Sequence, residues 1–147
     1  MSAQASPARV VSLLALAAIA CLAAEASFAQ DPRSAAVQQS AREWLGKTDR
    51  LDAAASFAAA GDKFRAPITV LEWTDALAKA RAPLGAVVQR ATMETAFDKA
   101  SAGRGPEVEI ATILYRTSFQ NNPLGNETVT LEHEPDGVWR VIGYFIR

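Results

Sequence analysis

The chain has 147 residues, of which 15 are Lys or Arg and 16 are Asp or Glu, so its formal net charge is −1. A nearly neutral chain lacks the basic face that contact with nucleic acid phosphates demands. It also lacks the excess of cationic residues that draws a protein to an anionic membrane surface. Its length fits one domain with a single core.

Residues 1–29 have the features of a cleavable secretory signal peptide. Arg9 supplies the positive charge, residues 10–24 form an uncharged apolar run, and Ser27-Phe28-Ala29 places small residues where signal peptidase reads them. The run is shorter than the roughly 20 residues that a membrane-spanning helix needs. We therefore predict cleavage after Ala29 and export to the periplasm or the medium, with residues 30–147 forming a single α+β domain. A retained N-terminal anchor is the alternative.

The only cysteine, Cys21, lies inside this apolar run. The stretch Ala18-Ile19-Ala20-Cys21 weakly resembles a bacterial lipoprotein box, in which Cys21 would be lipidated and would anchor the domain. The usual Leu three positions before the cysteine is Ala18 here, and the apolar run continues past Cys21. Cleavage after Ala29 would instead remove every thiol, and with it any disulfide, thiolate nucleophile or cysteine-ligated metal.

The first part of the remaining chain has the pattern of helices. Asp31-Pro32 is a good helix start, because Asp caps well and Pro at the first helical position sacrifices no needed donor. The apolar stripe of this first helix is Val37, Ala41, Trp44 and Leu45. Asp49 is expected to cap a second helix over residues 50–60, and Gly61 to end it.

A capping box opens the third predicted helix, because Thr69 is followed three residues later by Glu72. Its apolar stripe is Val70, Trp73, Leu77 and Ala78, and Pro83 lies just past its end.

After Gly85 the pattern changes to strands, which we predict near residues 86–97, 107–119, 127–134 and 138–147. The third strand alternates well, whereas the second and fourth are apolar on both faces and are expected to lie centrally. The predicted turns are 103–106, 121–125 and 134–137, the last being the sharpest hairpin signal. The predicted fold is α+β, with about three N-terminal helices packed on a curved four-stranded antiparallel sheet.

Several of these residues, in this order and spacing, resemble the bacterial domain-of-unknown-function family 4019. They are Trp44, Trp73, Arg81 to Gly85, Arg90, Glu127 and Gly137 to Tyr144. The resemblance implies a small exported protein, and it implies no activity because the family has none assigned. More loosely, the predicted elements are similar to nuclear transport factor 2-like and cystatin-like architectures, a likeness that does not fix function.

The sequence offers no recognisable catalytic, metal or cofactor motif. His133, the only histidine, lies between Glu132 and Glu134, so on a strand its side chain points opposite to both and metal ligands diverge. No nucleophile-elbow sequence is present, and Gly103 and Gly105 do not follow the phosphate-loop pattern. We therefore predict no catalytic residues, no metal and no cofactor; a pair of carboxylates brought together by folding would be invisible here.

Arginines among aromatic residues are the better candidates for a site. In one interpretation, Arg81 bonds the last carbonyls of its helix, and Arg90 pairs with a carboxylate or lies along apolar surface. In the other, Arg81 and Arg90 face the open side of the sheet beside Trp73, Tyr115 or Tyr144. There Arg81, Arg90, Trp73 and Tyr144 would bind an anionic or aromatic ligand.

These observations favour an exported, non-catalytic binding or envelope accessory module, with an unknown protein or small-molecule partner. The alternative is a small pocket enzyme of nuclear transport factor 2-like type that uses acid–base chemistry. That alternative requires a carboxylate or His133 to be buried with a shifted pKa. A deep cavity holding convergent polar groups would favour the enzyme, and a filled core the binding module.

Overall fold

The computed structural model describes residues 31–101 and 105–147. The predicted signal peptide, Cys21 within it and part of the turn predicted at 103–106 lie outside the described residues. Within the described ranges, no helix combines the length and the apolar character needed to cross a membrane.

In the part of the chain that the structure describes, four α-helices precede four strands. The helices are α1 (Arg33–Asp49), α2 (Ala53–Ala59), α3 (Asp62–Arg65) and α4 (Val70–Arg81), followed by a short 3₁₀ helix, η1 (Ala82–Leu84). The strands are β1 (Val87–Ser101), β2 (Glu107–Phe119), β3 (Asn122–His133) and β4 (Trp139–Ile146). They form one antiparallel sheet in the order β1-β2-β3-β4, so the α+β class and the four-stranded sheet are confirmed.

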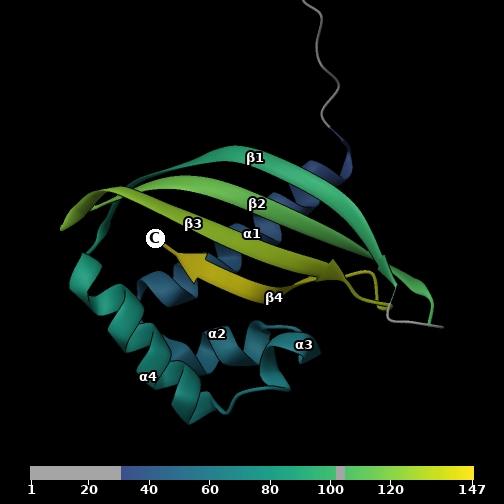
Figure 1. Cartoon of the computed structure of the whole chain (residues 1–147), viewed down its shortest axis with the longest axis horizontal. Coiled ribbons are helices and arrows are strands. Elements are labelled where there is room, and N and C mark those ends of the chain that lie inside the picture. The colour runs from purple at the N-terminus through teal and green to yellow at the C-terminus, as the bar shows by residue number, and fades with distance from the viewer. Residues whose placement is uncertain (1–30, 102–104) are drawn as a thin grey trace, which may run out of the picture.

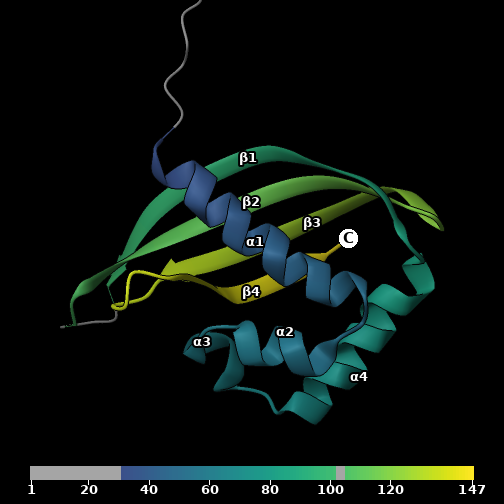
Figure 2. The same cartoon turned by 180° about the vertical axis from the view of Figure 1, so that it is seen from behind.

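The helices cover only one face of the curved sheet (Figures 1 and 2). In Figure 1 the sheet lies between the viewer and α1, and in Figure 2 α1 crosses in front of the strands. We call the face packed against α1 the inner face and the opposite one the outer face. Along β2, Ala111, Ile113, Tyr115, Thr117 and Phe119 are buried and alternate with more exposed residues, so they point to the inner face.

The N-terminal caps of α4 and α2 test two of the predicted helix starts. The capping box of α4 is present, because Thr69 accepts the backbone N–H of Glu72 and the Glu72 carboxylate accepts the N–H of Thr69. The predicted cap at Asp49 is wrong. Asp49 is the last residue of α1, and the Asp52 carboxylate caps α2 by accepting the N–H of Ala55 at 3.0 Å.

The second predicted helix divides into two. The helix α2 ends at Ala59, and Gly61 is the N-cap of the four-residue helix α3 instead of ending its predecessor. The N–H of Gly61 donates to the carbonyl of Val141 in β4 at 2.8 Å. A side chain at Gly61 would meet Glu134 Oε1 at 2.8 Å, so glycine allows this segment to lie against the sheet.

The prediction that the fourth strand is central is wrong, because β4 lies at one edge of the sheet and β2 and β3 are central. The apolar residues of β4 are explained by what covers this strand. The chain around Gly61 lies along the free edge of β4, and α1 packs beneath its inner face. The turn predicted at 121–125 is also shorter than expected, because β3 begins at Asn122.

The core lies between the helices and the inner face. Trp44, Trp73 and Trp139 are at most 7% exposed, which confirms them as core residues. Trp44 and Trp73 both donate to Ser56, to its carbonyl at 2.8 Å and to its hydroxyl at 2.9 Å. Phe64 packs edge-on against Trp73, with ring centroids 4.9 Å apart. These contacts hold α1, α2, α3 and α4 together under the sheet.

Candidate functional site

Two arginines and two carboxylates meet beneath the inner face, where α1 ends. Arg90 of β1 donates to both oxygens of Asp49, at 2.8 and 2.9 Å, and to both oxygens of Glu127, at 2.6 and 3.1 Å. Burial lowers the pKa of Arg90, but the bonds to Asp49 and Glu127 outweigh it and raise that pKa above its ordinary value. Arg90 is therefore a cation held between two anions.

Arg81, the last residue of α4, joins the same group from the other side. Its Nη2 donates to Asp49 at 3.1 Å and its Nη1 donates to the carbonyl of Gly85 at 3.2 Å. The side chain is 1% exposed, and its guanidinium lies 4.6 Å from the centre of the Phe119 ring. Arg81 therefore bonds a carbonyl beyond the end of α4 rather than the last helical carbonyls. Its Nε is buried without a partner among the described residues.

Glu127 of β3 is the most completely bonded group of the site. Its side chain is fully buried, and it accepts from Arg90, from the Thr117 hydroxyl at 2.5 Å and from the Tyr144 hydroxyl at 2.6 Å. Together with the two bonds from Arg90, this gives each carboxylate oxygen two donors. A carboxylate has about four lone-pair positions, so Glu127 has none left for a substrate proton.

Tyr144 connects this group, which we call the ion-pair network (Asp49, Arg81, Arg90, Thr117, Glu127 and Tyr144), to the aromatic core. Burial, the Glu127 charge and the hydrogen bond to Glu127 all raise the pKa of the Tyr144 hydroxyl above its ordinary value of 10.0. The Tyr144 ring lies edge-on to Trp44 at 5.1 Å and to Trp73 at 6.5 Å between centroids. Tyr144 is thus a protonated donor with an apolar body.

The structure brings together all four residues that the sequence singled out. Arg81 and Arg90 share Asp49, Tyr144 shares Glu127 with Arg90, and Trp73 packs against Tyr144. Sequence reasoning missed the two carboxylates as a pair. Asp49 was assigned to a helix cap, and Glu127 was noted only within the family resemblance.

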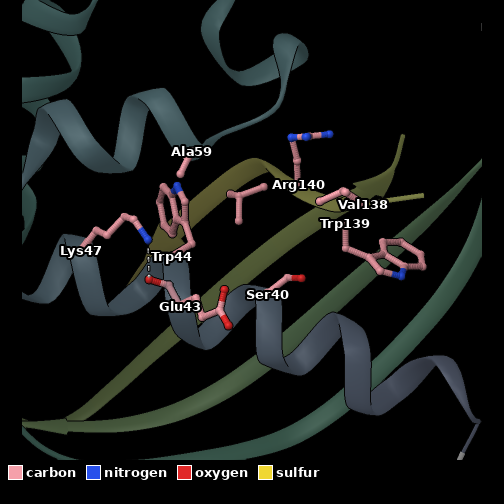
Figure 3. A pocket seen from close by; sticks show the side chains of 9 residues that line it. Ser40, Glu43, Trp44, Lys47, Ala59, Val138, Trp139 and Arg140 are labelled. Carbon is pink, nitrogen blue, oxygen red and sulfur yellow. Dashed lines mark hydrogen bonds between the residues drawn. The ribbon is translucent and has the colours of Figure 1, made fainter. Parts of the chain in front are cut away.

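One hollow opens beside the network, because Glu127 lines it together with Met93, Leu114 and Phe145. Another lies between α1, α2 and the start of β4 and has a volume of about 140 Å³ (Figure 3). We call it the α1–β4 cleft. It is lined by Ser40, Glu43, Trp44, Lys47, Ala59, Val138, Trp139, Arg140 and Val141.

The α1–β4 cleft combines an apolar floor with a charged rim. Trp44 and Val141 are buried, whereas Glu43 and Ala59 are exposed. The Lys47 ammonium folds back to the carbonyl of Glu43 at 3.3 Å, as the dashed line in Figure 3 marks. The space is smaller than the 300–1,000 Å³ or so typical of small-molecule sites.

His133 takes no part in either place. Its ring stacks on Trp139 with centroids 4.8 Å apart, and its Nδ1 lies 3.5 Å from Glu109. Within residues 31–101 and 105–147, no three His, Cys, Asp or Glu side chains are grouped so that they would hold a metal ion.

Comparison with known proteins places this arrangement in a family. No curated protein matches the sequence. Among solved structures, a ketosteroid isomerase-like protein from Erwinia carotovora atroseptica is similar, with a TM-score of 0.44 and 11% identity over 80% of this chain and 96% of that one. The family model described as "Protein of unknown function (DUF4019)" matches residues 40–144, a range that contains the whole ion-pair network. The resemblance noted in the sequence is therefore confirmed, and the chain belongs to the DUF4019 family.

Proposed function

We propose that the chain is an exported, non-catalytic binding module that meets a protein partner with its surface, while its interior serves stability alone. The observation that carries this proposal is the ion-pair network, whose charged groups bond one another beneath the inner face. Two cations face two anions there, and both Glu127 oxygens are fully bonded by the protein. An incoming anion would have to displace Asp49 or Glu127 from Arg90.

The α1–β4 cleft supports a protein partner rather than a free small molecule. At about 140 Å³ it admits a single apolar side chain, which is how many interfaces anchor a partner. The rim offers Glu43, Lys47 and Arg140, charges of both signs that suit a polar border around such an anchor. Export is part of the same proposal and rests on the pattern of residues 1–29.

Filling the cleft tests this proposal. Ala59→Trp places a large ring in the cleft, whereas Ala58→Trp puts the same ring on the neighbouring exposed position of α2, which does not line it. The tagged protein would be cross-linked in cells, purified from the exported fraction and analysed by mass spectrometry. We expect one protein to be cross-linked to the wild type and to Ala58→Trp, and to be at least about tenfold depleted with Ala59→Trp.

Two results would contradict the proposal. One is equal cross-linking of the partner to both tryptophan variants. The other is a small molecule that remains bound through purification and is lost when Arg90 is replaced, which would favour the pocket enzyme. The mass of the purified chain also tests export, because a chain beginning at Gln30 is expected and a lipidated Cys21 is the alternative.

A further inference from the structure

The first strand, β1, forms the upper edge of the sheet in Figures 1 and 2 and pairs with β2 on one side only. Register shifts interrupt its first half, where Met93 is the extra residue of a bulge. The second half, from Glu94 to Ser101, pairs with β2 without a shift. Such an edge presents backbone N–H and C=O groups with which a further extended chain can pair.

The hydrogen-bond pattern of the sheet can be followed from β4 to β1. Asn126 of β3 and Arg147, just after β4, exchange both of their backbone hydrogen bonds, at 3.0 and 2.9 Å. Bonded and non-bonded pairs alternate along an antiparallel ladder, so a residue that bonds one neighbouring strand is followed by one that bonds the other. Glu127 therefore bonds β2. By the same alternation, Leu114 of β2 bonds its partner Glu94 in β1.

Beyond Glu94 the alternation continues to the end of β1. Ala96 and Asp98 bond β2, so the residues between and after them turn their backbone groups to the free edge of β1. These are Thr95, Phe97 and Lys99. The N–H of Lys99 agrees with this assignment, because it donates to the carboxylate of Asp98 at 2.7 Å. Thr95 and Phe97 can thus each offer one donor and one acceptor to an added strand.

A polar hollow opens beside this edge, between the start of α1 and the bulge of β1. Its volume is about 350 Å³, and Asp31, Ser34, Gln38 and residues 92–95 line it. Among the described residues, the lining includes none of β2, so the hollow lies on the edge side of β1. Gln38 donates to the Thr95 hydroxyl at 3.0 Å and so fixes α1 against β1 at this point.

The charge of the hollow selects its occupant. The two charged side chains that line it, Asp31 and Glu94, are both acidic, and Arg42, further along α1, is not part of the lining. Arg33 already bonds both oxygens of Asp31, whereas Glu94 is exposed at the bulge. A cationic group in the hollow would therefore meet the Glu94 carboxylate.

We propose that an extended segment of a partner protein adds to the free edge of β1 beside Thr95 and Phe97, and that it places a lysine or arginine side chain in the hollow next to Glu94. The backbone bonds hold the segment, and the hollow determines which side chain it carries. Because β1 and β4 are opposite edges of the sheet, this site is separate from the α1–β4 cleft, and the inference goes beyond the proposed function.

A phage-displayed library of peptides of about seven residues, selected against the purified exported protein, tests the choice of segment. We expect the selected peptides to be rich in β-branched residues and to carry one Lys or Arg at a fixed position. Selection against Glu94→Lys should replace that basic residue by Asp or Glu. The matched control is Asp75→Lys on α4, which changes a 65% exposed side chain and should select the same basic peptides as the wild type.

A synthetic copy of the most frequent peptide tests strand addition. Fluorescence anisotropy should show at least about tenfold weaker binding to Thr95→Pro, because proline removes the N–H on the free edge. Thr95→Val is the matched control, since it loses the same hydroxyl but keeps that N–H and should bind as the wild type does.

Amide hydrogen exchange gives a second measurement that needs no variant, so it decides the question even if Thr95→Pro does not fold. The N–H groups of Thr95 and Phe97 should exchange quickly in the free protein and at least about tenfold more slowly when the peptide is saturating. The N–H of Ala96, which bonds β2, should exchange slowly in both states.

Several results would overturn the proposal. A library that yields no peptide, or a bound peptide that leaves the exchange of Thr95 and Phe97 unchanged, excludes strand addition at this edge. Selected peptides without a basic residue overturn the choice of side chain. Slow exchange of the same two amides at high protein concentration without peptide would mean that a second copy occupies the edge. None of these results depends on the Ala59→Trp experiment.

Discussion

At the scale of single residues, the interior is organised by Glu127 and Asp49. Glu127 is fully buried and Asp49 is 24% exposed, so the network is more open to solvent at Asp49 than at Glu127. A buried carboxylate is tolerable only when its lone pairs are bonded and its charge is balanced. Arg90 does both for Glu127, because it supplies two hydrogen bonds and one positive charge. Thr117 and Tyr144 complete the bonding.

The raised pKa of Tyr144 gives a testable dependence on pH. Its hydroxyl ionises near pH 10 in the unfolded chain and above that in the folded protein. Above pH 10 the unfolded state therefore binds fewer protons than the folded state, so the free energy of unfolding falls as pH rises. We expect the wild type to lose about 1 kcal/mol more than Tyr144→Phe between pH 9 and pH 11.

Urea unfolding at these two pH values measures the difference. Tyr144→Phe is the appropriate reference because it keeps the ring beside Trp44 and removes only the ionising group. The same loss of stability in both proteins would mean that the Tyr144 hydroxyl is not held by Glu127 in the folded state.

At the scale of elements, the sequence predicts a structure correctly where one residue forms a hydrogen bond with the residue three positions away. The capping box of α4 and the hairpin at 134–137, where Gly137 has φ = 83°, are of this kind. The prediction that Asp49 caps the second helix is wrong because the chain turns at Leu51, with φ = 57°. The helix α2 therefore starts later, with Asp52 as its N-cap. Nothing in the local pattern distinguishes these two aspartates.

The site was only half predictable for the same reason. Arg81 and Arg90 stand out among aromatic residues, but their partners are distant in sequence. Asp49 is 32 positions from Arg81 and 41 from Arg90, and Glu127 is 37 from Arg90. Strand pairing brings Arg90 and Glu127 together across β1, β2 and β3, and the packing of α1 under the inner face adds Asp49. The edge position of β4 was missed likewise, because the Gly61 segment that covers it belongs to the helical half.

The capping box gives a prediction at this scale. Thr69→Ala removes the acceptor for the N–H of Glu72 and should lower the free energy of unfolding by about 1 kcal/mol. Thr74→Ala is the matched control. The Thr74 hydroxyl bonds only the carbonyl of Val70 within α4, so its loss should change stability by less than about 0.5 kcal/mol. Thermal and urea unfolding measure both, and equal effects would show that the cap contributes nothing specific.

At the scale of the whole molecule, the two faces of the sheet have different roles. The inner face, with α1 to α4 beneath it, holds the aromatic core and the ion-pair network. The helices leave the outer face uncovered (Figure 1), and the α1–β4 cleft, where we propose that a partner binds, opens beside α1 (Figure 3). In the ion-pair network Arg81 and Arg90 face Asp49 and Glu127, so each positive charge has a negative partner within the protein. The central claim is therefore that the ion-pair network is structural.

The most direct test compares the stability of two variants. One loses a single charge of the network, and the other loses the Arg90 and Glu127 charges together with the Tyr144 hydroxyl. Glu127→Gln leaves Arg90 partly unbalanced and should lower the free energy of unfolding by about 3 kcal/mol. The triple variant Arg90→Met, Glu127→Leu, Tyr144→Phe replaces polar groups by apolar ones of similar size. It should lose clearly less stability than Glu127→Gln and should still cross-link the partner. A triple variant that folds stably but no longer cross-links the partner would contradict this account, because the network would then have a role in binding.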